Sequence, residues 1–209
     1  EEVLEPEGPK LESNSRVLMD GDVWVVGMKV KLNLLQEHLH IAYRRSRWQL
    51  LYSSNVQGGC ASTMLRMLKG RSPAIILVKD TQDHIFGAFI PFPLRSHPKH
   101  YGNDRCILFS LHPSFRVHAA SGDNPWYVLS NEKGFALGGL VSGNPAGAGF
   151  ALDSDLAEGT APERCVTYGS QRSIASAERF SCKVVEAWVL LRPDEGSVGS
   201  GASMLGNFA

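Results

Sequence analysis

The sequence predicts an α+β protein, a two-sheet antiparallel β-sandwich flanked by a few short helices. Short apolar runs recur along the chain, and those at 74–79 and 85–90 are continuous enough for strands covered on both faces. The polar residues between them predict a central β-hairpin with Asp83 or His84 in the left-handed position of the turn. Gly87 interrupts the return strand, which predicts a bulge or a close approach of another backbone segment.

Helical spacing occurs in a few places only. From residue 31, apolar side chains recur on one helical face; they are Leu32, Leu35, Leu39 and Tyr43. This pattern predicts an amphipathic helix. A second short helix is expected over about residues 61–68, where Gly70 and Pro73 then stop it. The segment 23–30 fits a strand or a helix equally well.

Short strands are expected at intervals through the rest of the chain. They cover residues 48–53, 106–111, 115–119, 126–130, 135–137, 149–152 and 180–191. Many short strands with two or three helices favour the α+β class. We expect one domain over 16–192, a flexible N-terminal linker over 1–15, and a flexible Gly- and Ser-rich tail over 193–209.

The composition argues against several kinds of partner. Lys plus Arg and Asp plus Glu both number 21, so no overall basic field favours nucleic acid. The cysteines lack CxxC spacing, which argues against a zinc site and favours a reducing compartment; they are Cys60, Cys106, Cys165 and Cys182. The apolar runs are too short to span a bilayer, so we expect a soluble protein without membrane insertion.

A series of motifs follows in order between residues 16 and 192. It comprises Trp-Gln-Leu-Leu-Tyr-Ser at 48–53, Gly58 with Cys60, Ile-Leu-Val-Lys-Asp at 76–80, Ile-Phe-Gly-Ala-Phe at 85–89, Tyr101 with Gly102, Cys-Ile-Leu-Phe-Ser-Leu-His-Pro at 106–113, the glycine-rich segment from Leu137 to Gly149, Leu-Asp-Ser-Asp-Leu-Ala-Glu-Gly at 152–159, Cys-Val-Thr-Tyr at 165–168 and Val-Val-Glu-Ala-Trp-Val-Leu at 184–190. In this order the motifs resemble the TLDc family. The motif residues assigned a structural role are Gly58, Asp80, Gly87, Gly102, Gly138, Gly139, Gly149, Glu186 and Trp188.

The TLDc resemblance implies a curved sandwich of two antiparallel sheets and a non-enzymatic domain that binds other proteins. It implies binding to the cytosolic subunits of the vacuolar-type proton ATPase, regulation of that pump, and a eukaryotic role in oxidative-stress resistance. It implies no cofactor, a cytoplasmic location peripheral to endolysosomal or vacuolar membranes, and a monomeric isolated domain. The alternatives are a redox-active scavenger or sensor that uses Cys60, and a structural subunit of a large assembly.

Cys60 is the candidate for redox chemistry. It stands where the second helix is expected to begin, and the free N–H groups of a helix N-terminus stabilise a thiolate. The family commonly has His-Gly-x-Ser here, whereas this chain has Gln-Gly-Gly-Cys at 57–60. The alternative reading is that Cys60 replaces a capping serine as a small, partly buried residue.

Histidines and glycines offer two further candidates. His97 and His100 have the spacing of two metal ligands, but no third ligand is evident, so we predict no metal site and expect exposed loop histidines. The glycines between 138 and 149 match no phosphate-binding motif, so we expect them to serve turns, bulges and close sheet packing.

Acidic residues supply the last candidates. Asp153, Asp155 and Glu158 have the residue types of a general acid and base, but we expect them to cap and turn the chain. Glu186 shares a strand face with Trp188, so it is either solvated at an edge or buried with a partner. We favour a structural salt bridge to an arginine, because an unpaired buried carboxylate is costly.

Overall fold

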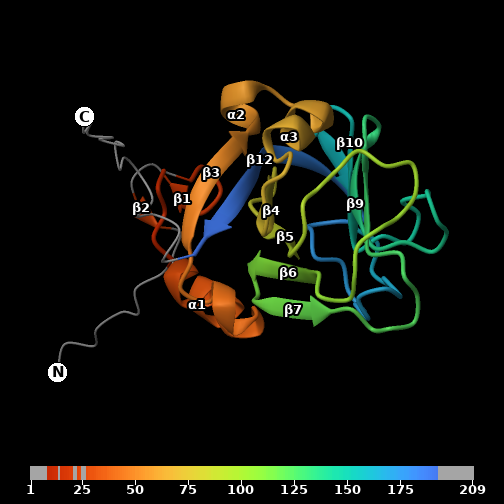
Figure 1. Ribbon diagram of the computed structural model, residues 1–209, viewed down its shortest axis with the longest axis horizontal. Coiled ribbons are helices and arrows are strands. Elements are labelled where there is room, and N and C mark those ends of the chain that lie inside the picture. The colour runs from red at the N-terminus through yellow and green to blue at the C-terminus, as the bar shows by residue number, and fades with distance from the viewer. Residues whose placement is uncertain (1–8, 14, 21–22, 25–26, 193–209) are drawn as a thin grey trace, which may run out of the picture.

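The computed structural model describes residues 9–13, 15–20, 23–24 and 27–192 (Figure 1). One long strand, β12 (Arg179–Leu191), joins two groups of antiparallel strands. Its first residues pair with the group that contains β11 (Glu158–Thr160), β10 (Phe150–Asp153), β9 (Gly134–Leu137) and β8 (Val128–Asn131). Its later residues pair with the group that contains β3 (Arg47–Ser53), β4 (Ala74–Asp80), β5 (Ile85–Ile90), β6 (Ile107–His112) and β7 (Arg116–Ala119). The predicted α+β sandwich is confirmed.

Two large hydrophobic cores, and a third small cluster of buried apolar residues on β8–β10, hold these layers together in the described part of the chain. Alternation along β4 sends Ile76 and Val78 into the core between the two strand groups, which also contains Phe150 of β10. The same alternation sends Ile75 and Leu77 into a second core on the opposite face. The expectation that the hairpin strands are covered on both faces is therefore confirmed.

The hairpin turn depends on two aspartates. Asp83 has a φ of 63°, so it supplies the left-handed position that the turn requires. The Asp80 side chain is buried and accepts hydrogen bonds from the backbone N–H groups of Gln82 and His84 at 2.9 and 2.8 Å. Its other oxygen accepts from Ser176 N at 3.0 Å, which ties the hairpin to a loop 96 residues away.

Gly87 lies where β5 passes close to its neighbour. A Cβ atom at this position would collide with the carbonyl oxygen of Ile76 on β4 and lie 3.1 Å from the Phe109 ring on β6. Only glycine fits this approach, because a displaced atom would be backbone rather than the end of a flexible side chain.

Helix α1 (Met28–His38) covers the second core and lies at the lower left of Figure 1, below β3 and level with β7. The helix expected from residue 31 therefore begins three residues earlier than predicted. It ends before Leu39, because the extended backbone of that residue (ψ 154°) breaks the helix. Tyr43 instead belongs to a 3-10 turn, Ile41–Tyr43, and still packs on the same core. The ambiguous segment 23–30 contains β2 (Val23–Trp24), which pairs with β1 (Met19–Asp20), and the first turn of α1.

The second expected helix is α3 (Ala61–Met67), preceded by the short α2 (Ser54–Gln57). Both lie at the top of Figure 1; α2 contacts β3 and β12, and α3 contacts β3, β8 and β9. Strand β11 was not predicted. None of the helices in the described residues is long and apolar enough to cross a membrane.

Part of the segment expected to be a linker, 1–15, lies against the domain. The backbone of Lys10 and Glu12 hydrogen-bonds to Trp48 at the start of β3 at 2.8 and 2.9 Å. Ser15 is fully buried. Residues 1–8 and the expected tail 193–209 lie outside the described residues.

Candidate functional site

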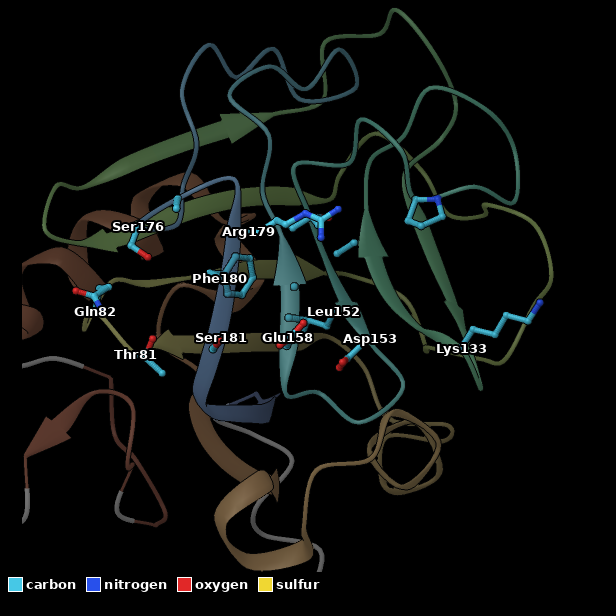
Figure 2. A pocket seen from close by; sticks show the side chains of 15 residues that line it. Thr81, Gln82, Lys133, Leu152, Asp153, Glu158, Ser176, Arg179, Phe180 and Ser181 are labelled. Carbon is cyan, nitrogen blue, oxygen red and sulfur yellow. The ribbon is translucent and has the colours of Figure 1, made fainter.

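A wide, open hollow of about 710 Å³ lies on the face of β10, β11 and β12 that is turned to solvent (Figure 2). In Figure 2 the hairpin turn residues Thr81 and Gln82 border it on one side and Lys133 borders it on the other; Pro145 also lines it. Most of the polar residues that line it are exposed. A hollow this open is accessible to a large partner from the side of the solvent.

The register of the strands places the lining side chains in rows. Ala151 of β10 lies opposite Thr160 of β11, and Thr160 lies opposite Arg179 of β12. In the next row, Glu158 of β11 lies opposite Ser181 of β12. Asp153, the last residue of β10, also lines the hollow.

The hollow contains both signs of charge. Asp153 and Glu158 carry the negative charge, and Arg179 and Lys133 carry the positive charge. Both carboxylates lie near Cys182: burial chiefly, and then the charges of Asp153, Asp80 and Glu158, raise the pKa of its thiol to about 12. In the described part of the chain, Glu158, Arg179 and Lys133 make no ion pair and no side-chain hydrogen bond. These three charges are therefore available to a partner.

A glycine-rich segment borders the hollow beside Pro145. A second, smaller pocket of about 90 Å³ lies under this segment and shares Lys133, Pro145 and Leu152 with the hollow. The segment exposes two large apolar side chains, Leu140 (54%) and Val141 (59%). The glycine-rich segment that borders the hollow therefore carries exposed apolar surface.

His100 holds the glycine-rich segment in place. Its Nδ1 accepts a hydrogen bond from Gly143 N at 3.1 Å, so the proton is on Nε2, which donates to Gly138 O at 3.1 Å. Burial lowers the pKa of His100 and favours this neutral form. Gly138 has a φ of 89°, which a residue with a side chain rarely adopts. The expectation that His100 is an exposed loop histidine is wrong, because its ring is buried under the segment that it binds.

Cys60 is the N-cap residue of α3, as the sequence predicts. Its Sγ lies 3.1 Å from Ser62 Oγ, and hydrogen bonds from Ser62 and Thr63 lower the pKa of the thiol to about 7. The Tyr52 hydroxyl donates to Gly58 O at 2.6 Å and accepts from Cys60 N at 3.1 Å, which fixes the loop before the helix. The Cys60 side chain is partly exposed. Because the pKa of its thiol is about 7, the thiol is partly ionised at neutral pH.

Glu186 is buried, but the predicted salt bridge to an arginine is wrong. Its carboxylate accepts hydrogen bonds from Ser15 Oγ (2.7 Å), Arg16 N (2.6 Å) and Trp188 Nε1 (3.1 Å). Burial raises the pKa of Glu186, and these neutral donors oppose that rise. Ser15 Oγ in turn accepts from the backbone N–H groups of residues 17 and 18. Glu186 thus anchors the N-terminal segment to β12.

The remaining motif residues shape the fold away from the hollow. A Cβ atom at Gly102 would collide with the Phe92 ring, one at Gly139 would lie 2.9 Å from His100 Nε2, and one at Gly149 would lie 2.5 Å from Leu108. Trp188 is fully buried and its ring lies 6.3 Å from that of Trp48.

Of the acidic candidates, Asp153 turns the chain as expected, because its Oδ1 accepts from Ala157 N at 2.9 Å. It also meets Glu158 in the hollow. Among the described residues, no three His, Cys, Asp or Glu side chains gather in a group that would hold a metal ion. Arg179 and Lys133 were missed by the sequence analysis, since their convergence depends on a strand that it did not predict.

The fold and the open hollow define a class: a sheet-rich α+β domain whose accessible site presents charged and apolar groups to another molecule. A family model described as TLDc domain matches residues 29–191. The chain belongs to the TLDc family, which confirms the resemblance found in its motifs.

Curated relatives match the chain over part of their length. The chain is 35% identical to MTOR-associated protein MEAK7 of Danio rerio over 145 aligned residues. The aligned residues cover 68% of this chain and 32% of that protein. It is 29% identical to MTOR-associated protein MEAK7 of Homo sapiens over 164 aligned residues, and these residues cover 76% of this chain and 35% of that protein. It is 30% identical to Oxidation resistance protein 1 of Homo sapiens over 144 aligned residues, and these residues cover 68% of this chain and 16% of that protein. The chain thus spans about a third or less of these relatives.

Proposed function

We propose that this chain is a non-enzymatic protein-interaction domain that binds the cytosolic sector of the vacuolar-type proton ATPase, regulates the pump and needs no cofactor. The match of 163 consecutive residues, 29–191, to the TLDc family carries this proposal. We propose further that the domain acts in the cytoplasm at the periphery of endolysosomal or vacuolar membranes, as a monomer.

Two observations support this proposal. Relatives are named for association with MTOR and for oxidation resistance, which supports a protein partner and a link to oxidative stress. The open hollow supports a macromolecular partner, since small-molecule sites usually enclose most of the ligand surface.

The test is a pull-down from lysate and from solubilised membranes with the whole 209-residue chain as bait, followed by mass spectrometry after a salt wash. We expect the cytosolic subunits of the pump in the bound fraction. A Gly87→Ala bait, which is expected to be destabilised, controls for dependence on the folded domain. Failure of the folded wild-type chain to retain any pump subunit would refute the proposal, and recovery of another assembly would favour a structural subunit.

Cys60 supports a second candidate function, a peroxide-reactive sensor or scavenger, because its thiol pKa is lowered to about 7. In that reaction the thiolate attacks the O–O bond of a peroxide, forms a sulfenic acid and releases hydroxide or alkoxide. The test compares peroxide consumption by the wild type and Cys60→Ser. Equal rates would exclude this role.

A further inference from the structure

The hollow on β10–β12 separates its charges in a regular way. Glu158 and Thr160 are two residues apart on β11, so their side chains lie on the same face roughly 6.6–6.8 Å apart along the strand. Arg179 lies opposite Thr160, not opposite Glu158. Glu158 and Arg179 are diagonal neighbours, about 7–8 Å apart and somewhat less at their Cβ atoms.

The opposite charges do not neutralise each other. Long side chains can bridge a diagonal pair of this kind, yet no ion pair joins Glu158 and Arg179. Asp153 adds a second carboxylate beside Glu158, and Figure 2 shows both near one border of the hollow with Arg179 farther along the strands. Lys133 precedes Gly134, which pairs with Asp153, so the carboxylate end of the hollow also contains one ammonium group. Two carboxylates against one ammonium still leave that end net negative, whereas the end at Arg179 is positive.

We propose that the hollow binds an extended segment of a protein partner that carries a basic residue and an acidic residue two positions apart, Lys or Arg followed or preceded by x and then Asp or Glu. In an extended chain, residues i and i+2 point to the same side and are about 6.6–6.8 Å apart. The basic side chain lies over Asp153 and Glu158, and the acidic side chain lies over Arg179. This inference rests on the proposed function, because it names the kind of segment through which the partner docks.

The surrounding groups suit a polypeptide. Hydroxyl and amide side chains line the hollow around the charges and supply donors and acceptors for a peptide backbone; they are Thr81, Gln82, Thr160, Ser176 and Ser181. The paired carboxylates oppose a nucleic acid, whose phosphates they repel.

The test is an NMR titration of the whole chain, labelled with ¹⁵N, with four short synthetic peptides of threonine and serine that differ at two central positions. The probes carry Lys-Thr-Glu, Lys-Thr-Lys, Glu-Thr-Glu or Gln-Thr-Gln. We expect Lys-Thr-Glu to bind best, about five- to tenfold more tightly than Gln-Thr-Gln, and to shift the amides of Glu158, Arg179 and Ser181.

Charge reversal provides the decisive comparison. Arg179→Glu is expected to make Lys-Thr-Lys the best probe, because the hollow then holds carboxylates at both ends. The matched control is Arg172→Glu, which makes the same change at an exposed residue outside the hollow and is expected to keep the wild-type ranking. Equal affinities for all four probes, no binding at millimolar peptide, or equal effects of the two reversals would overturn the proposal. A pump that still binds the chain in those cases would leave the proposed function intact and place the contact elsewhere.

Discussion

Replacing Glu186 is expected to detach the N-terminal segment from β12. In the native protein the buried carboxylate accepts hydrogen bonds from Ser15 Oγ at 2.7 Å, Arg16 N at 2.6 Å and Trp188 Nε1 at 3.1 Å. Glu186→Ala removes the acceptor of all of these donors. Glu186→Gln keeps one acceptor oxygen but turns an N–H₂ group towards donors.

The magnitude follows from the unsatisfied donors. Each buried donor without an acceptor costs about 1–3 kcal/mol, and partial relaxation of the segment towards water reduces the sum. We expect a loss of about 3–5 kcal/mol for Glu186→Ala and about 1–2 kcal/mol for Glu186→Gln. For a chain of this size, the larger loss lowers the melting temperature by roughly 6–20 °C.

Urea unfolding followed by tryptophan fluorescence measures these free energies. Tryptic cleavage after Arg16 reports separately on release of the segment, and we expect it to accelerate in Glu186→Ala. Glu178→Ala, at an exposed carboxylate one residue before β12, is the matched control and is expected to change neither readout. If Glu186→Ala unfolds at the same urea concentration as this control, the anchoring role is wrong.

The pH dependence of the Glu186 contribution has a defined sign. Burial raises the pKa of Glu186 in the folded state above the ordinary value of 4.5, which applies to the unfolded state. At a pH between the unfolded-state pKa and the folded-state pKa, the folded state therefore binds more protons than the unfolded state. The free energy of unfolding of the wild type, relative to Glu186→Gln, should therefore rise as pH falls through this window. A fall over the same window would contradict the burial of an ionisable group here.

Three further predictions concern other positions. Alkylation of Cys60 by iodoacetamide, followed by mass spectrometry, should reach half its maximal rate near pH 7, since its thiol pKa is about 7; a midpoint two pH units higher would contradict this. Gly87→Ala should cost about 2–4 kcal/mol in urea unfolding, because its Cβ meets Ile76 O, and a neutral effect would be the opposing result. Burial lowers the pKa of His100 below 6.5, so its contribution to stability is present above pH 6.5 and is lost as pH falls through the lowered value. The protection factor of the Gly143 amide, which donates to His100, should then fall relative to the intrinsic exchange rate at the same pH, and an unchanged protection factor would count against this role.

The sequence was enough to predict structure where burial of a strand on both faces restricts its residues to apolar types. The continuous apolar runs of β4 and β5 predicted the central hairpin, and the polar turn predicted Asp83 or His84 in the left-handed position, which Asp83 occupies. The alternation along β12 likewise predicted that Glu186 shares a face with Trp188. These features depend on neighbours in the sequence, which is why the sequence revealed them.

The hollow depends on neighbours in space and was not predicted. Strand β11 has only three residues, and Glu-Gly-Thr has neither alternation nor β-branched enrichment. Without β11, nothing in the sequence shows that Glu158 and Arg179 share a face. Glu186 shows the same limit, since its partner Ser15 is 171 residues away and the sequence favoured a salt bridge to an arginine over a solvated edge position.

The most direct test of the docking function is equilibrium binding of the purified chain to the purified cytosolic sector of the vacuolar-type proton ATPase. Surface-immobilised sector is titrated with wild type, Arg179→Glu and the control Arg172→Glu, each shown to be folded by circular dichroism. We predict saturable binding by the wild type and by Arg172→Glu, and weaker binding by Arg179→Glu. Absence of saturable binding by the folded wild type would contradict the proposal that this domain docks onto the pump.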